Sequence, residues 1–229
     1  MPADDALALA RGLRLQWFGK GSADRVAEPV IEPLWSGLRV IAAAQDGVGA
    51  LLDDGQDVLG HDELAQALAA AVATTASGAI FDAYVTTQVA TDEPGVYMGE
   101  VDLPKAGNMI TGGLIGRGRR PRREELAEDL GADRIGDDEP VNLVAVDLLW
   151  LDGEWLLDAP LLERKRLLEA VLPGDQLVRA SMYVRPPFTR WVGSWRAQGF
   201  RGLAFKGANS RYRPGEVASD WITRPMPRR

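Results

Sequence analysis

The segment from Val141 to Leu151 is a nearly continuous apolar run that is broken by Asp147. A run of this kind is typical of a central strand that is buried on both faces of a sheet. The next residues, Asp152 and Gly153, are typical of a tight turn. With 229 residues, of which 46% are hydrophobic, the chain is long enough to bury a sizeable core around such a strand. The segment therefore predicts a globular domain organised around a sheet.

Hydrophobic periodicity and turn residues predict further strands and helices on both sides of this run. We find no internal repeat, and the order of elements favours an α+β fold with mostly antiparallel strands. The expected elements are a hairpin (strands 38–42 and 48–52, turn at Asp46-Gly47), a helix capped by Asp62 and running to about Ala76, a strand at 79–85, a helix opened by Asp158 and Pro160 with residues 163–166 facing solvent, a helix capped by Thr189 and ending at Gly199, and strands at 202–206 and 219–223.

Two other segments shape the predicted domain organisation. Residues 1–30 are expected to form a short amphipathic helix and a linker, because Gly19-Lys20-Gly21-Ser22 interrupts the pattern, and the domain proper is expected at 31–229. Residues 91–122 are rich in glycine and are predicted to form a long loop, which a helix at 123–130 closes.

Composition excludes several classes of site. The chain has no cysteine and one histidine, His61, so it has neither disulfides, nor thiolate zinc sites, nor a site of several histidines. Its first residues are acidic and no apolar run is long enough to span a bilayer, which predicts a cytoplasmic protein without membrane attachment. The net charge of −7 argues against a protein that coats nucleic acid.

Four segments, in this order, resemble the nucleotidyltransferase (adenylation) domain of ATP-dependent DNA ligases, especially the bacterial repair type. The resemblance covers about residues 30–225 and implies an ATP-grasp-like fold of two mostly antiparallel sheets with flanking helices. The third and fourth segments are the specific ones. The segments are Glu32-Pro33-Leu34-Trp35-Ser36-Gly37-Leu38-Arg39 (family motif E-P-K-x-D-G-x-R), Ala79-Ile80-Phe81-Asp82-Ala83-Tyr84 (V-L-D-G-E), Val144 to Arg166 (F-D-L-L-x-L-D-G and P-L-x-E-R), and Phe200 to Gly215 (E-G-x-x-x-K and S-x-Y-x-P-G), which leads to Trp221 (W-x-K-x-K).

The residues that carry chemistry in that family are replaced in this chain. The family lysine attacks the α-phosphorus of ATP, and carboxylates hold divalent ions. The resemblance places Leu34 at the nucleophile and Ser36 at the neighbouring aspartate. It also places Tyr84 and Arg201 at metal-binding glutamates, Val146 at the adenine-stacking aromatic, and Thr223 and Pro225 at the lysines of the last motif.

Some candidate binding residues remain. The resemblance keeps family cations at Arg39 and Lys206, which are candidates for phosphate or nucleotide binding, although ordinary surface or ion-paired cations are the simpler interpretation. A basic run is a candidate nucleic-acid contact or a solvated loop neutralised by the acidic residues that follow it. The run consists of Arg117, Arg119, Arg120, Arg122 and Arg123.

These observations predict a ligase-like protein that does not ligate, and that acts as a binding or scaffolding module with a protein partner in DNA repair and with weak DNA binding. No cofactor is expected. The alternatives are an active ATP-dependent ligase or nucleotidyltransferase, which would use ATP and Mg²⁺, and a reversible nucleotide or DNA sensor.

No lysine occurs between Lys20 and Lys105, so a small shift of the first motif does not recover a nucleophile. The chain stops shortly after the last motif, so no C-terminal oligonucleotide-binding-fold domain is expected. The four segments are expected to surround one cleft, with Leu34 within roughly one helix diameter of Lys206.

Overall fold

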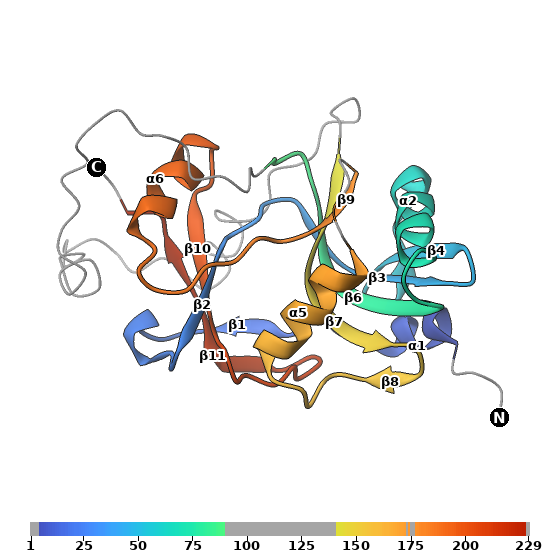
Figure 1. Ribbon diagram of the computed structural model, residues 1–229, viewed down its shortest axis with the longest axis horizontal. Helices are drawn as coiled ribbons and strands as arrows, with labels where there is room; N and C mark the ends of the chain where they lie inside the picture. Colours follow the sequence, from blue (N-terminus) through green and yellow to red (C-terminus); the bar gives the residue numbers. More distant parts are fainter. Residues whose placement is uncertain (1–4, 90–140, 173, 175–176, 228–229) are drawn as a thin grey trace.

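The structure is a computed structural model that describes residues 5–89, 141–172, 174 and 177–227 (Figure 1). Two sheets lie side by side with helices packed around them, as predicted for the α+β class. The elements are α1 (Ala6–Gly12), β1 (Trp17–Gly19), the 3-10 helix η1 (Ala23–Arg25), β2 (Pro29–Pro33), β3 (Leu38–Gln45), β4 (Val48–Asp53), β5 (Gln56–Asp57), α2 (Asp62–Val72), β6 (Gly78–Thr86), β7 (Asn142–Leu151), β8 (Glu154–Trp155), α5 (Leu161–Val171), β9 (Val178–Ala180), α6 (Thr189–Ala197), β10 (Gly202–Gly207) and β11 (Val217–Pro225).

The larger sheet has the strand order β5-β4-β3-β6-β7-β8, and β9 pairs with β7. All its pairings are antiparallel except that between β7 and β9. The apolar run is β7, which is buried along nearly its whole length, and the predicted hairpin is β3 and β4. Both predictions are confirmed.

Both faces of the larger sheet are covered. Val40, Ala42 and Ala44 of β3 belong to a core that α2 and the end of α5 complete. Ile41 and Ala43, which point to the other face, belong to a second core with α1. Burial on two faces explains why the central strands are continuously apolar.

The smaller sheet has the order β1-β11-β10-β2, and only the β1–β11 pairing is parallel. Helix α6 contributes Val192 and Trp195 to a third core, which also includes Phe200 and Leu203. In Figure 1 this sheet and α6 lie on the left, whereas α1 and α2 lie on the right against the larger sheet.

The segment predicted to be a helix and linker is part of this fold. Helix α1 packs on β3, β1 joins the smaller sheet, and the boundary predicted near Ile31 falls inside β2. The glycine-rich stretch was predicted to be a linker, but Gly19 is required for packing. A Cβ at Gly19 would lie 1.9 Å from the Ala218 carbonyl oxygen.

Two predicted helix caps are wrong by one residue. Helix α2 begins at Asp62 and α6 begins at Thr189, so their N-caps are His61 and Phe188, and neither N-cap side chain caps its helix. A cap residue must lie outside the helix so that its side chain can reach the free N–H groups. The sequence therefore located these helix starts to within one residue, but not their caps.

The turn after β7 is held by the Asp152 carboxylate, which accepts hydrogen bonds from the Ser77 N–H (2.8 Å), the Ser77 hydroxyl (2.7 Å) and the Gly78 N–H (3.1 Å). Burial acts to raise the pKa of the Asp152 carboxyl, but these hydrogen bonds outweigh it and hold the pKa below its usual value. Asp152 adopts a left-handed backbone (φ 45°), which asparagine tolerates.

We expect Asp152→Asn to lower the free energy of unfolding by about 1 kcal/mol at neutral pH, because hydrogen bonds to a carboxylate are stronger than those to an amide but solvent weakens them here. Because the pKa of Asp152 in the folded state is below its ordinary value of 3.8, the carboxylate stabilises the protein at pH values above 3.8. This contribution is lost as the pH falls through the folded-state pKa. The unfolding free energies of wild type and variant, measured with urea, should therefore converge as pH falls below 3.8 and through the folded-state pKa. A difference that persists in acid would contradict the role of the charge.

Candidate functional site

A small pocket lies between the two sheets, where the ends of β2 and β10 face β3, β6 and β7. Its volume is about 10 Å³, which is about the room that one water molecule needs. Each of the four ligase-like segments contributes residues, as predicted for a shared cleft. The pocket is lined by Phe18, Glu32, Pro33, Leu34, Trp35, Arg39, Tyr84, Val146, Ala204 and Lys206.

Leu34 is fixed by the strand that precedes it and the loop that follows it. Its backbone N–H donates to the Gly202 carbonyl (3.0 Å) at the start of β10. The loop turns at Gly37 (φ 111°), where a Cβ would lie 2.2 Å from the Val85 carbonyl oxygen. Only glycine fits at this position, so packing alone requires this residue of the motif.

Beside the pocket, Glu32 forms a buried charge cluster with two lysines. The Lys165 Nζ lies 2.8 Å from Glu32 Oε1, and the Lys206 Nζ lies 3.2 Å from Glu32 Oε2. All three side chains are at most 2% exposed. Lys206 also lies over the Trp221 ring, 4.4 Å from its centroid. Burial lowers the pKa of Lys206, and Lys165 acts in the same direction, whereas Glu32 opposes this.

Arg39 is held by a second carboxylate, that of Asp82. Its guanidinium donates through Nε (2.9 Å) and Nη2 (2.5 Å) to the two carboxylate oxygens. The Tyr212 hydroxyl donates to Asp82 (3.0 Å) and accepts from the Gln16 N–H (3.0 Å). Arg39 and Lys206 therefore line one pocket, but each is already paired with a buried carboxylate.

Tyr84 does not suit the metal-binding role that the resemblance assigns to its position. Burial raises the pKa of its phenol to about 12, although Arg39 opposes this. A phenol that stays neutral near pH 7 does not supply the anionic oxygen that Mg²⁺ prefers. Among the described residues, no group of three or more acidic or histidine side chains is placed to hold a metal ion. The residues in this part of the chain do not fit the metal that the family implies.

Asp147, the polar interruption of the apolar run, pairs with Arg164 of α5. The guanidinium donates to both carboxylate oxygens, from Nε (2.8 Å) and Nη2 (2.7 Å), and both side chains are fully buried. The prediction that residues 163–166 face solvent is therefore wrong for Arg164 and Lys165. Buried charges are usually paired, so Asp147 within a buried strand was the signal in the sequence that a buried partner exists, although it does not say which residue that partner is.

Phe18 of β1 closes the pocket on the side of the smaller sheet. The Arg39 guanidinium lies 5.5 Å from the centroid of its ring, and the Trp221 ring centroid lies 5.8 Å from it. Trp17, by contrast, is 55% exposed. Phe18 lies outside the four ligase-like segments, so the resemblance does not place it at the pocket. Glu32 and Lys165 lie within these segments, but their ion pair was not predicted.

The candidate nucleic-acid run lies within 117–123, outside the described residues, so the structure does not place its arginines. Arg224, near the end of β11, is described, and its Nη2 donates to the Gly21 carbonyl (2.6 Å). In the described part of the chain, no helix has the length and apolar character needed to cross a membrane.

The family model described as "ATP dependent DNA ligase domain" matches residues 64–223, well over half of the 229 residues. The multifunctional non-homologous end joining protein LigD of Mycolicibacterium smegmatis is 29% identical over 194 residues, which are 83% of this chain and 20% of that protein. The DNA ligase of Methanothrix thermoacetophila is 33% identical over 95 residues, which are 40% of this chain and 17% of that protein. The chain thus spans about a fifth of the length of these relatives.

Among solved structures, the ligase domain of M. tuberculosis LigD superposes with a TM-score of 0.64 at 23% identity, covering 94% of this chain and 60% of that one. The complex of bacteriophage T7 ATP-dependent DNA ligase with ATP superposes with a TM-score of 0.50 at 13% identity, covering 96% and 69%. At these identities the superpositions confirm the predicted fold and carry no conclusion about activity.

Proposed function

This chain belongs to the family of ATP-dependent DNA ligase domains, and on that premise we propose that it is a non-catalytic member. In this proposal it serves in the cytoplasm as a binding or scaffolding module in DNA repair, together with a protein partner. The observation that carries the proposal is Leu34, an alkyl side chain at the position of the nucleophilic lysine, in a pocket whose cations are already paired with buried carboxylates.

The size of the pocket supports the proposal. Sites for small molecules and cofactors have volumes of roughly 300 Å³ or more, whereas the volume here is about 10 Å³. Phe18, Leu34 and Tyr84 are among the side chains that close it. A nucleotide could enter only if several of these side chains moved.

The amines near the pocket also support it. Lys165 and Lys206 are the lysines beside the pocket in the described part of the chain, and both ammonium groups contact Glu32. A lysine attacks phosphorus only as a free amine. Either one would have to lose its proton and leave its contact with Glu32 before it could attack.

A link to DNA repair is supported by the relatives, one of which is named as a non-homologous end joining protein. That relative is matched over only a fifth of its length. The repair process and the partner of this chain are therefore part of the proposal.

Incubation with α-³²P-labelled ATP and Mg²⁺ or Mn²⁺, followed by a denaturing gel, tests the proposal. We expect no covalent label on the wild-type protein, because no amine is placed to attack. The ligase domain of M. tuberculosis LigD, run in parallel, is the positive control. Robust label on this chain would overturn the proposal in favour of an active nucleotidyltransferase. Reversible ATP binding without label, measured by calorimetry, would favour a nucleotide sensor.

We expect at most weak, sequence-independent DNA binding that falls steeply with salt. Replacing Arg119, Arg120, Arg122 and Arg123 by alanine should abolish it, because each lost phosphate contact removes about 0.9 from the slope of log affinity against log salt. Fluorescence anisotropy with a nicked duplex at several salt concentrations measures this slope. Arg166→Ala, which removes an exposed arginine of α5, is the control. A tight complex that survives moderate salt would show that DNA is a principal ligand.

A further inference from the structure

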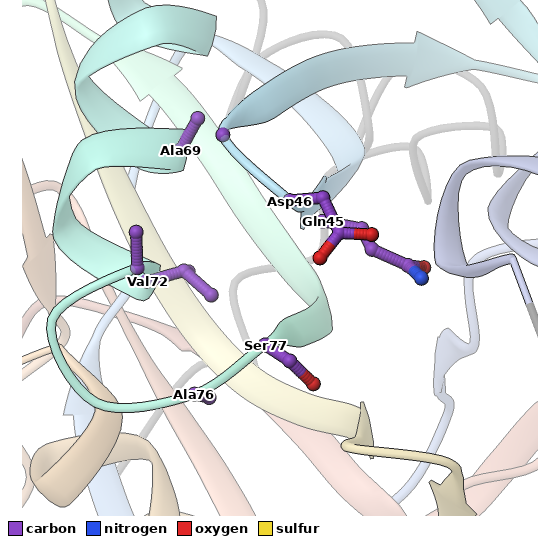
Figure 2. A pocket seen from close by; sticks show the side chains of 8 residues that line it. Gln45, Asp46, Ala69, Val72, Ala76 and Ser77 are labelled. Atoms are coloured by element: carbon purple, nitrogen blue, oxygen red, sulfur yellow. The ribbon is translucent and has the colours of Figure 1, made fainter. Parts of the chain in front are cut away.

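A second hollow lies on the larger sheet, away from the pocket between the sheets. It is formed where the β3–β4 turn meets the C-terminal end of α2 (Figure 2). Its volume is about 220 Å³, enough for one long side chain but less than the roughly 300 Å³ of the smallest typical ligand sites. Ala69, Val72, Ala73 and Ala76 provide an apolar wall.

The polar groups of this hollow are not equivalent. The Gln45 side chain extends towards α1, where its Oε1 accepts from the Ala6 N–H (2.5 Å). The Ser77 hydroxyl donates to Asp152 (2.7 Å). Within the described ranges, the Asp46 carboxylate has neither an ion pair nor a side-chain hydrogen bond, and Figure 2 shows it beside the hollow. One anionic group is therefore available to a ligand.

The electrostatics of α2 add to this negative charge. The C-terminal end of a helix carries a partial negative charge, which basic residues in the last turn commonly offset. Helix α2 has no basic residue in its last turn, and its acidic residues are in the first turn. The hollow therefore combines a carboxylate and a negative helix end with an apolar wall.

We propose that this hollow, lined by Asp46 and by the C-terminal end of α2, receives an arginine side chain of a protein partner. The aliphatic stem would pack along Ala69, Val72 and Ala73, and the guanidinium would donate to Asp46. An anionic ligand such as a nucleic-acid phosphate is disfavoured by the same charges. The surface is separate from the pocket between the sheets, so the proposal stands whether or not the chain forms an AMP adduct.

Two capped amino acids of nearly the same shape test the proposal on the full chain. We expect N-acetyl-arginine methylamide to shift the backbone amide NMR signals of residues 45–47 and 69–77 with a dissociation constant of about 1 mM, as a single side chain can provide. The neutral analogue N-acetyl-citrulline methylamide should bind at least about fivefold more weakly, since its ureido group carries no charge and cannot form an ion pair with Asp46. Equal binding of both, or no shifts in these residues, would overturn the proposal.

Two variants locate the binding. Asp46→Asn keeps the left-handed turn (φ 51°) and should weaken arginine binding about fivefold. Asp54→Asn, at the equivalent left-handed position (φ 47°) of the β4–β5 turn, is the matched control and should leave binding unchanged. Ala73→Leu fills the hollow from an exposed position and should abolish binding. Binding that survives both Asp46→Asn and Ala73→Leu would place the arginine elsewhere and contradict the proposal.

Discussion

The Leu34→Lys variant is expected to form no covalent AMP adduct at a rate that approaches that of a ligase. The new ammonium would lie in a pocket that already contains Arg39 and Lys206, and the nucleotide has no room beside it. Tyr84, whose phenol has a pKa of about 12, cannot supply the anionic metal ligand that offsets developing phosphate charge. Positioning, metal binding and nucleophile act as a unit, so restoring one of them restores little activity.

The same labelling assay measures this variant beside the wild type and the ligase domain of M. tuberculosis LigD. Its unfolding curve should be recorded as well, because a lysine at a partly buried position destabilises the fold and could itself prevent labelling. The prediction concerns the folded variant. Strong label on folded Leu34→Lys would show that the rest of the pocket is still a competent ATP site.

The Glu32→Gln variant is expected to lose about 3–5 kcal/mol of unfolding free energy, which is the cost of leaving buried charges without their partner. Glu32 is the carboxylate that both Lys165 and Lys206 contact, and all three side chains are almost completely buried. Glutamine has the same shape but no charge, so the loss measures the ion pairs rather than packing. Urea denaturation followed by tryptophan fluorescence gives the difference.

Glu163→Gln is the matched control for this measurement. It removes an exposed carboxylate paired with Arg166 on α5, and we expect a change within about 0.5 kcal/mol. A triple variant, Glu32→Leu with Lys165→Met and Lys206→Met, should recover most of the stability, because a buried ionic cluster can be replaced by apolar side chains with little loss. A loss below about 1 kcal/mol for Glu32→Gln would mean that water reaches the cluster and screens its charges.

Local patterns made much of the fold predictable. The strand β7, the β3–β4 hairpin and the helix starts at Asp62 and Thr189 follow from apolar runs and turn residues that are near one another in sequence. The four ligase-like segments also meet at one pocket, as their resemblance predicts.

Long-range pairing could not be predicted in the same way. Glu32, Lys165 and Lys206 come from three distant segments, and a charged residue in a helix such as α5 is usually on its solvated face. Phe18 was missed for a related reason. A glycine-rich stretch is typical of a linker, yet Gly19 is needed for close contact between β1 and β11.

The pairing of β1 with β11 also affects how the domain is made. Trp17 pairs with Val217, and the backbone of Gln16 binds the Tyr212 hydroxyl, although 196 positions separate these two residues. During synthesis on the ribosome, β1 emerges early. It has no strand to pair with until β11 has been translated. Such distant contacts slow folding, because loop closure precedes the gain from contact. Phe18 therefore reaches its place in the pocket only after nearly the whole domain has been synthesised.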